Sequence, residues 1–513
     1  MRLGNSNPNF RIYLVVAFVG CVYGIFILRL IDLQVIKHDQ FELEARSQYQ
    51  VDMGDVFNRG SIYFTNKNGD HILAADIEED KVKKGDKEVV LRNRVYPLGD
   101  IGSKVLGFVA YDENTRKGQY GIEKYYDDVL GRDSSKLYTN FFAEMFTDIK
   151  GNIMSNKSVY EGDVVLTVDV EVQRALHKVL EETHNKWNSD VIGGIVMDPS
   201  DGRIIAMDEL PTYDNNDFSK VEDFKVYKND LISGVYEMGS IIKPITMASA
   251  LDAGVVDENT FYNDVGVREL GGFKVRNYDG KARGWSNVQL ILDKSLNIGI
   301  VFLVEKLGGE KFSEYFRKFG IGSETGIDLP NEAAGLTKNL DSGIFVDSAT
   351  AGFGQGIAIT PIQTIRALAA LGNGGKLVNP YITDSLVYDN GLTKKIVPDQ
   401  GEQILKDDTS ERISRMLVHV VDNALQNGKW KKEHYTVAAK TGTAQIPRPG
   451  GGYYDDRYLH SFFGYFPAYN PKYIVFLYHT YPKGAEYASQ TLTEPFYKIT
   501  DFLISYFGVQ PDR

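Results

Sequence analysis

The chain has 513 residues, 43% of them hydrophobic and 25% charged, which is the composition of a folded protein of two or three domains. Acidic residues number 69 against 57 lysines and arginines, so the net charge of -12 argues against nucleic-acid binding, and we expect no DNA or RNA partner. Cys21 is the only cysteine and excludes an intramolecular disulfide, while the 8 histidines form no ligand pair at helical spacing. We therefore expect no metal and no cofactor.

The N-terminal region has the pattern of a membrane anchor. Ile12 to Ile31 is interrupted by a single charge, Arg29, whose long side chain can reach the membrane interface, and a bilayer needs about 20 such residues. Arg2 and Arg11 precede this run, which by the positive-inside tendency leaves residues 1–11 as a cytoplasmic tail. No small-residue cleavage site follows, so we expect an uncleaved anchor with the rest of the chain outside the cell.

Leu30 to Tyr49 is predicted to continue the anchor helix outward, and the residues from 58 to about 160 form short, charged segments punctuated by glycine that carry no catalytic pattern. Within them residues 58–75 alternate in hydrophobicity and turn at Asn68 and Gly69, which predicts a β-hairpin. By itself this region has the character of an interaction or spacer domain.

From residue 161 onward the chain changes to longer helices and strands. Asp169 is placed to cap one helix, Thr360 to Gln363 form a capping box for a second that closes at Gly372, and a third opens at Asp408. Strands are predicted at Val191–Met197, Arg203–Met207, Thr436–Gln445, Ser461–Pro467 and Tyr473–Thr480. Because helices and strands are segregated rather than alternating, we predict an α+β fold with an antiparallel sheet flanked by helices.

Tyr236 to Ala253 places a serine and a lysine three residues apart at the start of a helix. Gly239 is a stop signal just before it, and Pro244 is tolerated only near a helix beginning. Ser240 and Lys243 then share one face, as a nucleophile beside a candidate base. Burial, the positive helix end and any second cation would favour a neutral Lys243. Taken alone, this tetrapeptide also fits two surface residues, so other segments must decide.

A second cluster, Ser295 to Asn297, lies between the apolar runs Val288–Leu292 and Ile300–Leu307. This position predicts a turn between two core helices, which can present a hydroxyl that relays a proton and an amide that holds a carbonyl. A plain helix cap is the alternative interpretation.

A third cluster, Lys440 to Thr443, ends the predicted strand Thr436–Gln445. Gly442 within a strand commonly marks a close approach to the backbone. Lys440 with the hydroxyls of Thr441 and Thr443 could receive a carboxylate there. An edge strand protected by a lysine is the alternative.

The order and spacing of the three clusters resemble those of the serine penicillin-recognising enzymes, through S-x-x-K as SIIK, S-x-N as SLN and K-T-G as KTGT. More narrowly, the chain is similar to class B penicillin-binding proteins, monofunctional D,D-transpeptidases of peptidoglycan synthesis. The segments that carry this similarity are RLIDLQV, NRGSIYFTNKNG, GQYGIEKYYDDVLG, VVLTVDVEVQ, GGIVMDPSDGRIIAM, YEMGSIIKP, GFGQGIAITPIQ and KTGTAQ. EMGSIIKP, KTGTAQ and SFFGYFPAYNPKYIV favour the septal, cell-division type.

The resemblance implies a role for each cluster residue. Ser240 would attack the penultimate D-Ala carbonyl of a stem peptide, Lys243 would accept its proton, and Ser295 would pass a proton to the leaving amine. The remaining roles are amide binding by Asn297, carboxylate binding by Lys440 with Thr441, Gly442 and Thr443, and an oxyanion hole made by the backbone N-H groups of Ser240 and Thr443. β-Lactams, which mimic D-Ala-D-Ala, would acylate Ser240.

The resemblance also implies an organisation. It implies a transmembrane anchor at 12–31, a short, mostly-β pedestal or dimerisation-like domain at 32–160 and a transpeptidase domain at 161–513. The expected location is the bacterial cytoplasmic membrane, with a glycan polymerase of the SEDS family and division-complex membrane proteins as partners. Met238, where a proline is usual, and Leu296, where septal members often have serine, depart from the family pattern; neither side chain supplies chemistry.

Several alternatives remain open at this point. A D,D-carboxypeptidase uses the same acyl-enzyme with water as acceptor, and an elongation-type transpeptidase shares the three clusters. A β-lactam sensor or a scaffold could keep the fold without turnover. A class A β-lactamase needs a glutamate in E-x-x-L-N, which the segment around Glu332 does not match.

Overall fold

The computed structural model describes residues 18, 57–84, 87–112, 115–132, 160–397 and 400–513. Their larger compact unit holds Asn58–Glu78 and Arg94–Arg513. The smaller includes Glu79–Asn93, where the side chains of Arg92 and Glu79 form an ion pair at 2.8 Å. The predicted anchor at 12–31 lies outside the described residues apart from Phe18. Within the ranges described, no helix combines the length and the apolar character needed to span a bilayer.

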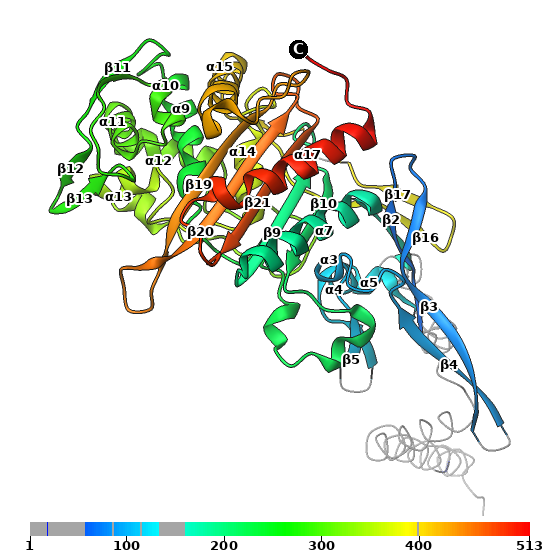
Figure 1. The fold of residues 1–513 in the computed structure, drawn as a ribbon. Coiled ribbons are helices and arrows are strands. Elements are labelled where there is room, and N and C mark those ends of the chain that lie inside the picture. The colour runs from blue at the N-terminus through cyan, green and yellow to red at the C-terminus, as the bar shows by residue number, and fades with distance from the viewer. Residues whose placement is uncertain (1–17, 19–56, 85–86, 113–114, 133–159, 398–399) are drawn as a thin grey trace, which may run out of the picture. The chain divides into compact units, whose positions relative to one another are not determined.

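A five-stranded sheet forms the centre of the larger unit (Figure 1). Its order is β10 (Ile204–Leu210), β9 (Val191–Met197), β21 (Tyr473–Thr480), β20 (Tyr453–Phe466) and β19 (Ala438–Pro447). Every neighbouring pair is antiparallel, which confirms the predicted α+β class with an antiparallel sheet. The strand that carries the third cluster, β19, is at one edge.

Two strands differ in their bounds from the prediction. β20 begins at Tyr453 rather than Ser461, because its polar first half pairs with the end of β19 out to Pro447. β19 begins and ends two residues later than predicted, so Lys440 to Thr443 lie in its first part and not at its end.

Alternate residues of the sheet face two separate cores. Phe462 and Leu477 face the core formed with α7 (Val170–Trp187) and α17 (Thr493–Phe507), which cover one side of the sheet in Figure 1. Phe463 faces the opposite and larger core.

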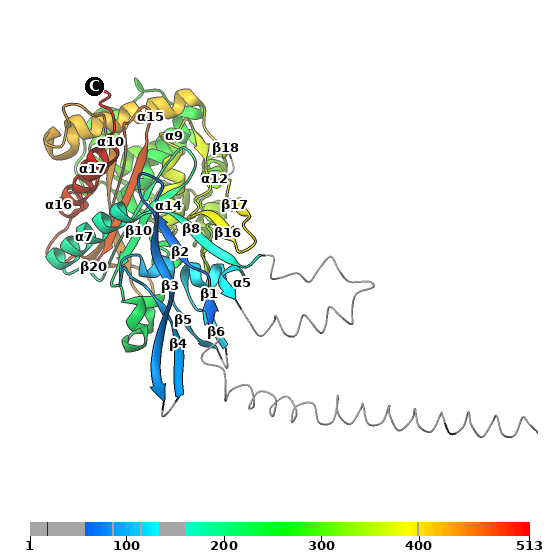
Figure 2. The same cartoon turned by 90° about the vertical axis from the view of Figure 1, so that its right-hand side faces the viewer.

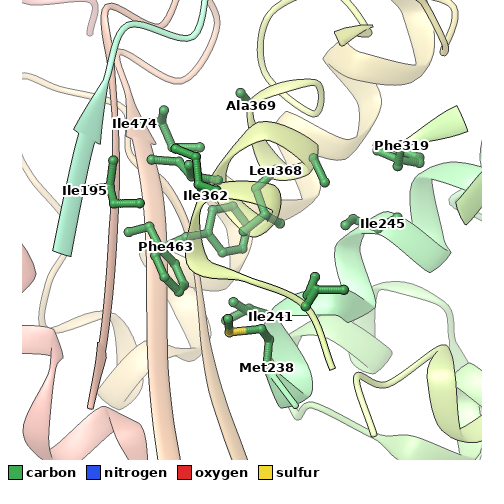
Figure 3. Packing of buried hydrophobic residues seen from close by; sticks show 14 of the residues in the cluster. Ile195, Met238, Ile241, Ile245, Phe319, Ile362, Leu368, Ala369, Phe463 and Ile474 are labelled. Carbon is green, nitrogen blue, oxygen red and sulfur yellow. The ribbon is translucent and has the colours of Figure 1, made fainter. Parts of the chain in front are cut away.

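α14 (Pro361–Ala369) is buried within the larger core. In Figure 3, Ile362 and Leu368 of α14 lie between sheet residues, such as Phe463, and α9 (Lys243–Asp252). All residues of α9 are buried, so the helix that follows Ser240 is fixed on every side.

Helix caps follow the predictions in part. The Asp169 carboxylate accepts the N-H groups of Glu171 and Val172 and caps α7, as predicted. Thr360 caps α14, but Gln363 does not complete the capping box, because its side-chain oxygen accepts the N-H of Gly322 at 3.3 Å while its amide donates to the carbonyl of Ala333. The helix ends at Ala369, before the predicted Gly372.

A second sheet lies beside the central one, and Figure 2 shows several of its strands together. β8 (Gly162–Asp169) runs parallel to β2 (Ile62–Thr65) and antiparallel to β16 (Thr383–Tyr388). β2 pairs with β3 (His71–Lys84) across a turn at Gly69, which confirms the predicted hairpin. The sheet therefore joins strands from both sides of the predicted domain boundary at residue 160, which stays a prediction.

Further helices pack around α9 in the larger unit. α11 (Asn297–Leu307), α12 (Gly309–Lys318) and α15 (Asp407–His419) contact α9 directly, and α13 (Phe345–Ala351) packs against α11 and α12. Shorter elements include β5 (Val109–Asp112), β6 (Thr115–Gly118), α3 (Ser103–Leu106), α4 (Gly121–Tyr125), α5 (Asp127–Leu130), α8 (Asp230–Ser233), β11 (Phe261–Asp264), β12 (Val267–Leu270), β13 (Phe273–Arg276), β14 (Gly284–Asn287) and β17 (Thr393–Lys395).

A buried charge cluster fixes the N-terminal part of the larger unit. The fully buried carboxylate of Glu123 on α4 pairs with Arg59 at 2.5 Å and Arg94 at 2.7 Å. Burial alone would raise the pKa of Glu123, but attraction to the two guanidinium groups outweighs it and lowers the pKa. The cluster therefore keeps the Glu123 carboxylate ionised, and removing this carboxylate would destabilise both buried arginines.

We predict that Glu123→Gln lowers the free energy of unfolding by about 3–5 kcal/mol, because it removes the carboxylate that pairs with the buried Arg94 and leaves the buried Arg59 with Asp127 as its remaining carboxylate partner. Chemical denaturation followed by tryptophan fluorescence measures this loss. Glu314→Gln, which removes a solvent-exposed carboxylate on α12, is the control and should unfold like the parent chain. Equal stability of the two variants would contradict the assignment.

Candidate active site

Ser240 lies in η5 (Gly239–Ile242), a single 3-10 turn that leads directly into α9. Pro244 occupies the first turn of α9, as the sequence predicted. Gly239 has a left-handed φ of 63°, and a Cβ there would lie 2.9 Å from the carbonyl oxygen of Thr443. Glycine is required for both reasons. The serine turn, which is η5 with Ser240, thus lies directly against β19.

The segment from Gly352 to Ile359 supports the serine turn from another side. The N-H of Gly239 donates to the carbonyl of Gly354 at 3.0 Å, and Tyr236 and Ile359 exchange two backbone hydrogen bonds, each 3.0 Å. A Cβ at Gly354 would lie 2.1 Å from the carbonyl oxygen of Gly239. No other residue than glycine fits this contact.

Glu237 joins three segments around Ser240. Its carboxylate accepts the N-H of Gly356 at 3.0 Å and the hydroxyl of Tyr453, at the start of β20, at 3.1 Å. Burial raises the pKa of Glu237. Sequence reasoning did not single out Glu237 or Tyr453, although Glu237 lies within the YEMGSIIKP segment.

The second cluster forms the predicted turn between two helices, α10 (Gln289–Asp293) and α11. Ser295 has a left-handed φ of 54°, which costs a non-glycine residue on the order of 1 kcal/mol and is often found at functional sites. The Asn297 side-chain amide donates to the carbonyl of Arg276 at 2.9 Å, and the Asn277 side chain accepts the N-H of Ile298 at 3.1 Å. These contacts orient Asn297 and leave its amide oxygen able to accept a hydrogen bond.

The amines of Lys243 and Lys440 meet at Ser295. Lys243 Nζ donates to the Ser295 carbonyl at 2.6 Å and lies 3.2 Å from Ser295 Oγ. Lys440 Nζ also lies 3.2 Å from Ser295 Oγ and donates to the Thr441 carbonyl at 2.9 Å. Lys243 is 0% exposed and Lys440 is 4% exposed. Lys440 therefore points inward, which excludes the alternative of a lysine that protects an exposed strand edge.

Burial lowers the pKa of both amines, and repulsion by Lys440 lowers that of Lys243 further. The pKa of Lys243 falls well below its ordinary value, first through burial and then through the charge of Lys440. Burial lowers the pKa of Lys440 to about 8, against an opposing effect from Asp293. The arrangement thus favours a neutral Lys243 beside a protonated Lys440.

The third cluster is built for close approach. A Cβ at Gly442 would lie 2.3 Å from Ser461 Oγ and 2.9 Å from the carbonyl oxygen of Met238. Ser461 Oγ donates to that same carbonyl at 2.8 Å, so β20 also holds the serine turn. The Thr443 hydroxyl accepts the N-H of Ala488 at 3.1 Å.

The structure thus brings the three sequence clusters together through Ser295 and the contact of η5 with β19. One detail differs from the sequence expectation: within the described residues no hydrogen bond joins Ser240 Oγ to Lys243 Nζ, whose partner is Ser295. The arrangement offers a half-buried hydroxyl at Ser240, a buried amine of lowered pKa at Lys243, and a second hydroxyl at Ser295 that both buried amines approach. These are the parts of an acyl-transfer site.

Comparison with known proteins agrees with this chemistry. The family model described as the penicillin-binding protein transpeptidase domain matches residues 192–501. Stage V sporulation protein D of Bacillus subtilis is 33% identical over 413 residues, covering 78% of this chain and 62% of that protein. The peptidoglycan D,D-transpeptidase FtsI of Escherichia coli is 27% identical over 427 residues, covering 82% and 68%. The chain therefore spans less than two thirds of the Bacillus protein.

The fold is also similar to a solved structure. Penicillin-binding protein 3 of Mycobacterium tuberculosis, crystallised as a complex with aztreonam, superposes with a TM-score of 0.75 at 26% identity. The match covers 90% of this chain and 98% of that one.

We predict that Gly442→Ala destabilises the chain by about 1–3 kcal/mol, because the new methyl group overlaps Ser461 Oγ and pushes the serine turn from β19. Adding Ser461→Ala should recover part of this loss, which equilibrium unfolding of the single and double variants measures. Gly309→Ala, where the methyl group would make only an ordinary contact, is the control. Strictly additive losses would contradict the overlap.

Proposed function

Because the chain belongs to the family of penicillin-binding protein transpeptidase domains, we propose that it is a serine D,D-transpeptidase that cross-links peptidoglycan stem peptides. The observation that carries this proposal is the pair of buried lysine amines that share Ser295 Oγ beside the Ser240 turn. A serine and a lysine exposed to solvent at the surface would not show two buried amines in contact with a second serine. The names of the Escherichia coli relative and the aztreonam complex of the Mycobacterium protein agree with it.

In the first half-reaction, Ser240 Oγ attacks the penultimate D-Ala carbonyl of a stem peptide. Its proton passes to the amine of Lys243, because burial lowers the pKa of this amine and so favours the neutral form that can accept a proton. The C-N bond to the terminal D-Ala then breaks, and the leaving amine takes a proton through Ser295 Oγ. An ester of Ser240 and free D-Ala result.

The developing oxyanion is stabilised by the backbone N-H groups of Ser240 and Thr443. The glycines at 239 and 442 permit this, because each allows the serine turn and β19 to approach within van der Waals contact. One such donor contributes roughly 3–4 kcal/mol to transition-state stabilisation in comparable enzymes.

The groups around the scissile bond orient the substrate. β19 is the edge strand of its sheet, so an extended stem peptide can lie along it. Asn297 accepts the acyl-side amide N-H, and the ammonium of Lys440 with the hydroxyls of Thr441 and Thr443 holds the terminal carboxylate. In the second half-reaction, the side-chain amine of another stem peptide attacks the ester and releases Ser240.

A β-lactam would follow the first half-reaction only. Its strained amide opens on Ser240, but the leaving nitrogen stays tethered in the same molecule, so the ester remains. The proposed setting is septal wall synthesis at the bacterial cytoplasmic membrane, with residues 12–31 as a single-pass anchor. Similarity to FtsI and the septal-type sequence motifs support that setting, with a SEDS-family glycan polymerase and division-complex membrane proteins as partners.

The first test is covalent labelling. A fluorescent penicillin should label the parent chain, and Ser240→Ala should lose at least 1000-fold in labelling rate, in line with the loss of other activated nucleophiles. Circular dichroism must show that the variant is folded. Undiminished labelling of the folded variant would reject Ser240 as the nucleophile.

The second test separates transpeptidation from hydrolysis. Incubation of the chain with a pentapeptide stem and an acceptor amine should yield the cross-linked amide together with one D-Ala per bond formed, as mass spectrometry can count. Release of D-Ala with a tetrapeptide acid as the sole product would instead identify a D,D-carboxypeptidase.

A further inference from the structure

A buried pair of histidines lies beside the strand that carries Thr443, and the proposed mechanism does not use it. His460 of β20 stands opposite Thr443 of β19 in the ladder, and His479 of β21 stands opposite His460. Both histidines are 0% exposed, and their rings meet edge to face with 5.3 Å between centroids. Polar groups this deeply buried cost free energy unless they are hydrogen-bonded, so the partners of the pair indicate what it holds.

The partners lie in and just before α16 (Ala488–Thr491). His460 Nε2 lies 3.1 Å from the carbonyl oxygen of Glu486, and His460 Nδ1 lies 2.9 Å from Thr491 Oγ1. His479 Nε2 lies 2.9 Å from the same Thr491 Oγ1. Two strands of the sheet thus hold one short segment through three polar contacts.

The chemistry of the partners fixes the direction of these hydrogen bonds. A carbonyl can only accept, so His460 Nε2 donates to Glu486. Burial lowers the pKa of His460 to about 4, so its ring is neutral and its Nδ1 accepts the Thr491 hydroxyl hydrogen. The Thr491 oxygen in turn accepts from His479 Nε2. His479 Nδ1, which has no hydrogen-bond partner within the described ranges, is then the nitrogen without a hydrogen.

The segment held in this way contacts the proposed carboxylate site. The backbone N-H of Ala488 donates to Thr443 Oγ1 at 3.1 Å. The two residues bonded to His460, Glu486 and Thr491, lie on either side of Ala488 in the chain. A hydroxyl oxygen that already accepts can turn its own hydrogen to a second partner, and a carboxylate is a partner that only accepts. The contact thus suits Thr443 for donating to the terminal carboxylate of a stem peptide.

We propose that His460 is a positioning residue: it holds the segment in which the N-H of Ala488 reaches Thr443, and so orients the Thr443 hydroxyl toward the substrate carboxylate. His460 does not touch the substrate or the reacting atoms. His479 supports the same arrangement from β21 through the shared hydroxyl of Thr491. This inference rests on the proposed function, since it concerns the group that Thr443 is proposed to bind.

The test compares benzylpenicillin with its methyl ester as acylating agents of the full chain, with mass spectrometry of the intact protein as the readout. The ester lacks the negative charge, so its rate depends far less on the orientation of the Thr443 hydroxyl. Thr491→Val removes the shared hydroxyl at similar volume and should lower the acylation rate with the free acid about tenfold, the effect of one charge-assisted hydrogen bond. The rate with the ester should stay close to that of the parent chain.

Two substitutions of His460 provide an independent measurement. His460→Phe has no nitrogen for Glu486 or Thr491 and should show the same loss, confined to the free acid. His460→Gln can place an amide N-H near the position of Nε2 and should recover most of the free-acid rate, because the bond to Glu486 is restored. Circular dichroism checks that the variants are folded, and Thr491→Val carries the test if His460→Phe does not fold.

Thr500→Val is the matched control. Thr500 of α17 is also fully buried, but its hydroxyl donates to the carbonyl of Phe496 in its own helix, so its loss should leave both rates unchanged. A second comparison uses Thr443→Val as the background, in which Thr491→Val should cause no further loss, because both changes act through the same hydroxyl.

The proposal is overturned if Thr491→Val slows the acid and the ester equally, as a merely structural role would, or if it slows neither. A loss that adds in full to that of Thr443→Val would overturn it as well. Failure of the proposed function looks different: the parent chain is then acylated by neither compound, or Ser240→Ala is acylated as well.

Discussion

The arrangement of the site depends on one interaction, the sharing of Ser295 Oγ by the buried amines of Lys243 and Lys440. Two ammonium ions cannot occupy such a place together, since charge repulsion in a dry environment adds to the cost of burial. One amine must lose its proton, and a base is thereby created at neutral pH without a histidine. The same contact ties together three segments that are far apart in the chain.

The rest of the fold fixes the positions of these three segments relative to one another. The antiparallel sheet supplies β19, the larger core fixes α9 on all sides, and the loop at 352–359 fixes the serine turn by backbone hydrogen bonds. Glycines at 239, 354 and 442 stand where a side chain would separate these parts. Close approach of the backbones, rather than any single strong bond, thus sets the distance between the nucleophile and the strand that faces it.

Local patterns in the sequence predicted much of this arrangement. The turn at Ser295, the helix start near Pro244 and the sheet strands were predicted because each depends on periodicity and stop signals within a few residues. The contact of Glu237 with Tyr453 could not be predicted, because it joins residues that lie 216 positions apart in the chain. Gln363 shows the same limit: a capping box was expected, but its side-chain oxygen accepts the N-H of Gly322 and its amide donates to the carbonyl of Ala333, which are both distant in the chain.

The most direct measurement is a crystal structure of the chain after reaction with a penicillin. The account predicts an ester bond to Ser240 Oγ, the carbonyl oxygen of the ester between the N-H groups of Ser240 and Thr443, and the drug carboxylate at Lys440 and Thr441. A drug bound to another residue, or lying at a distance from Ser295 and Lys440, would contradict it.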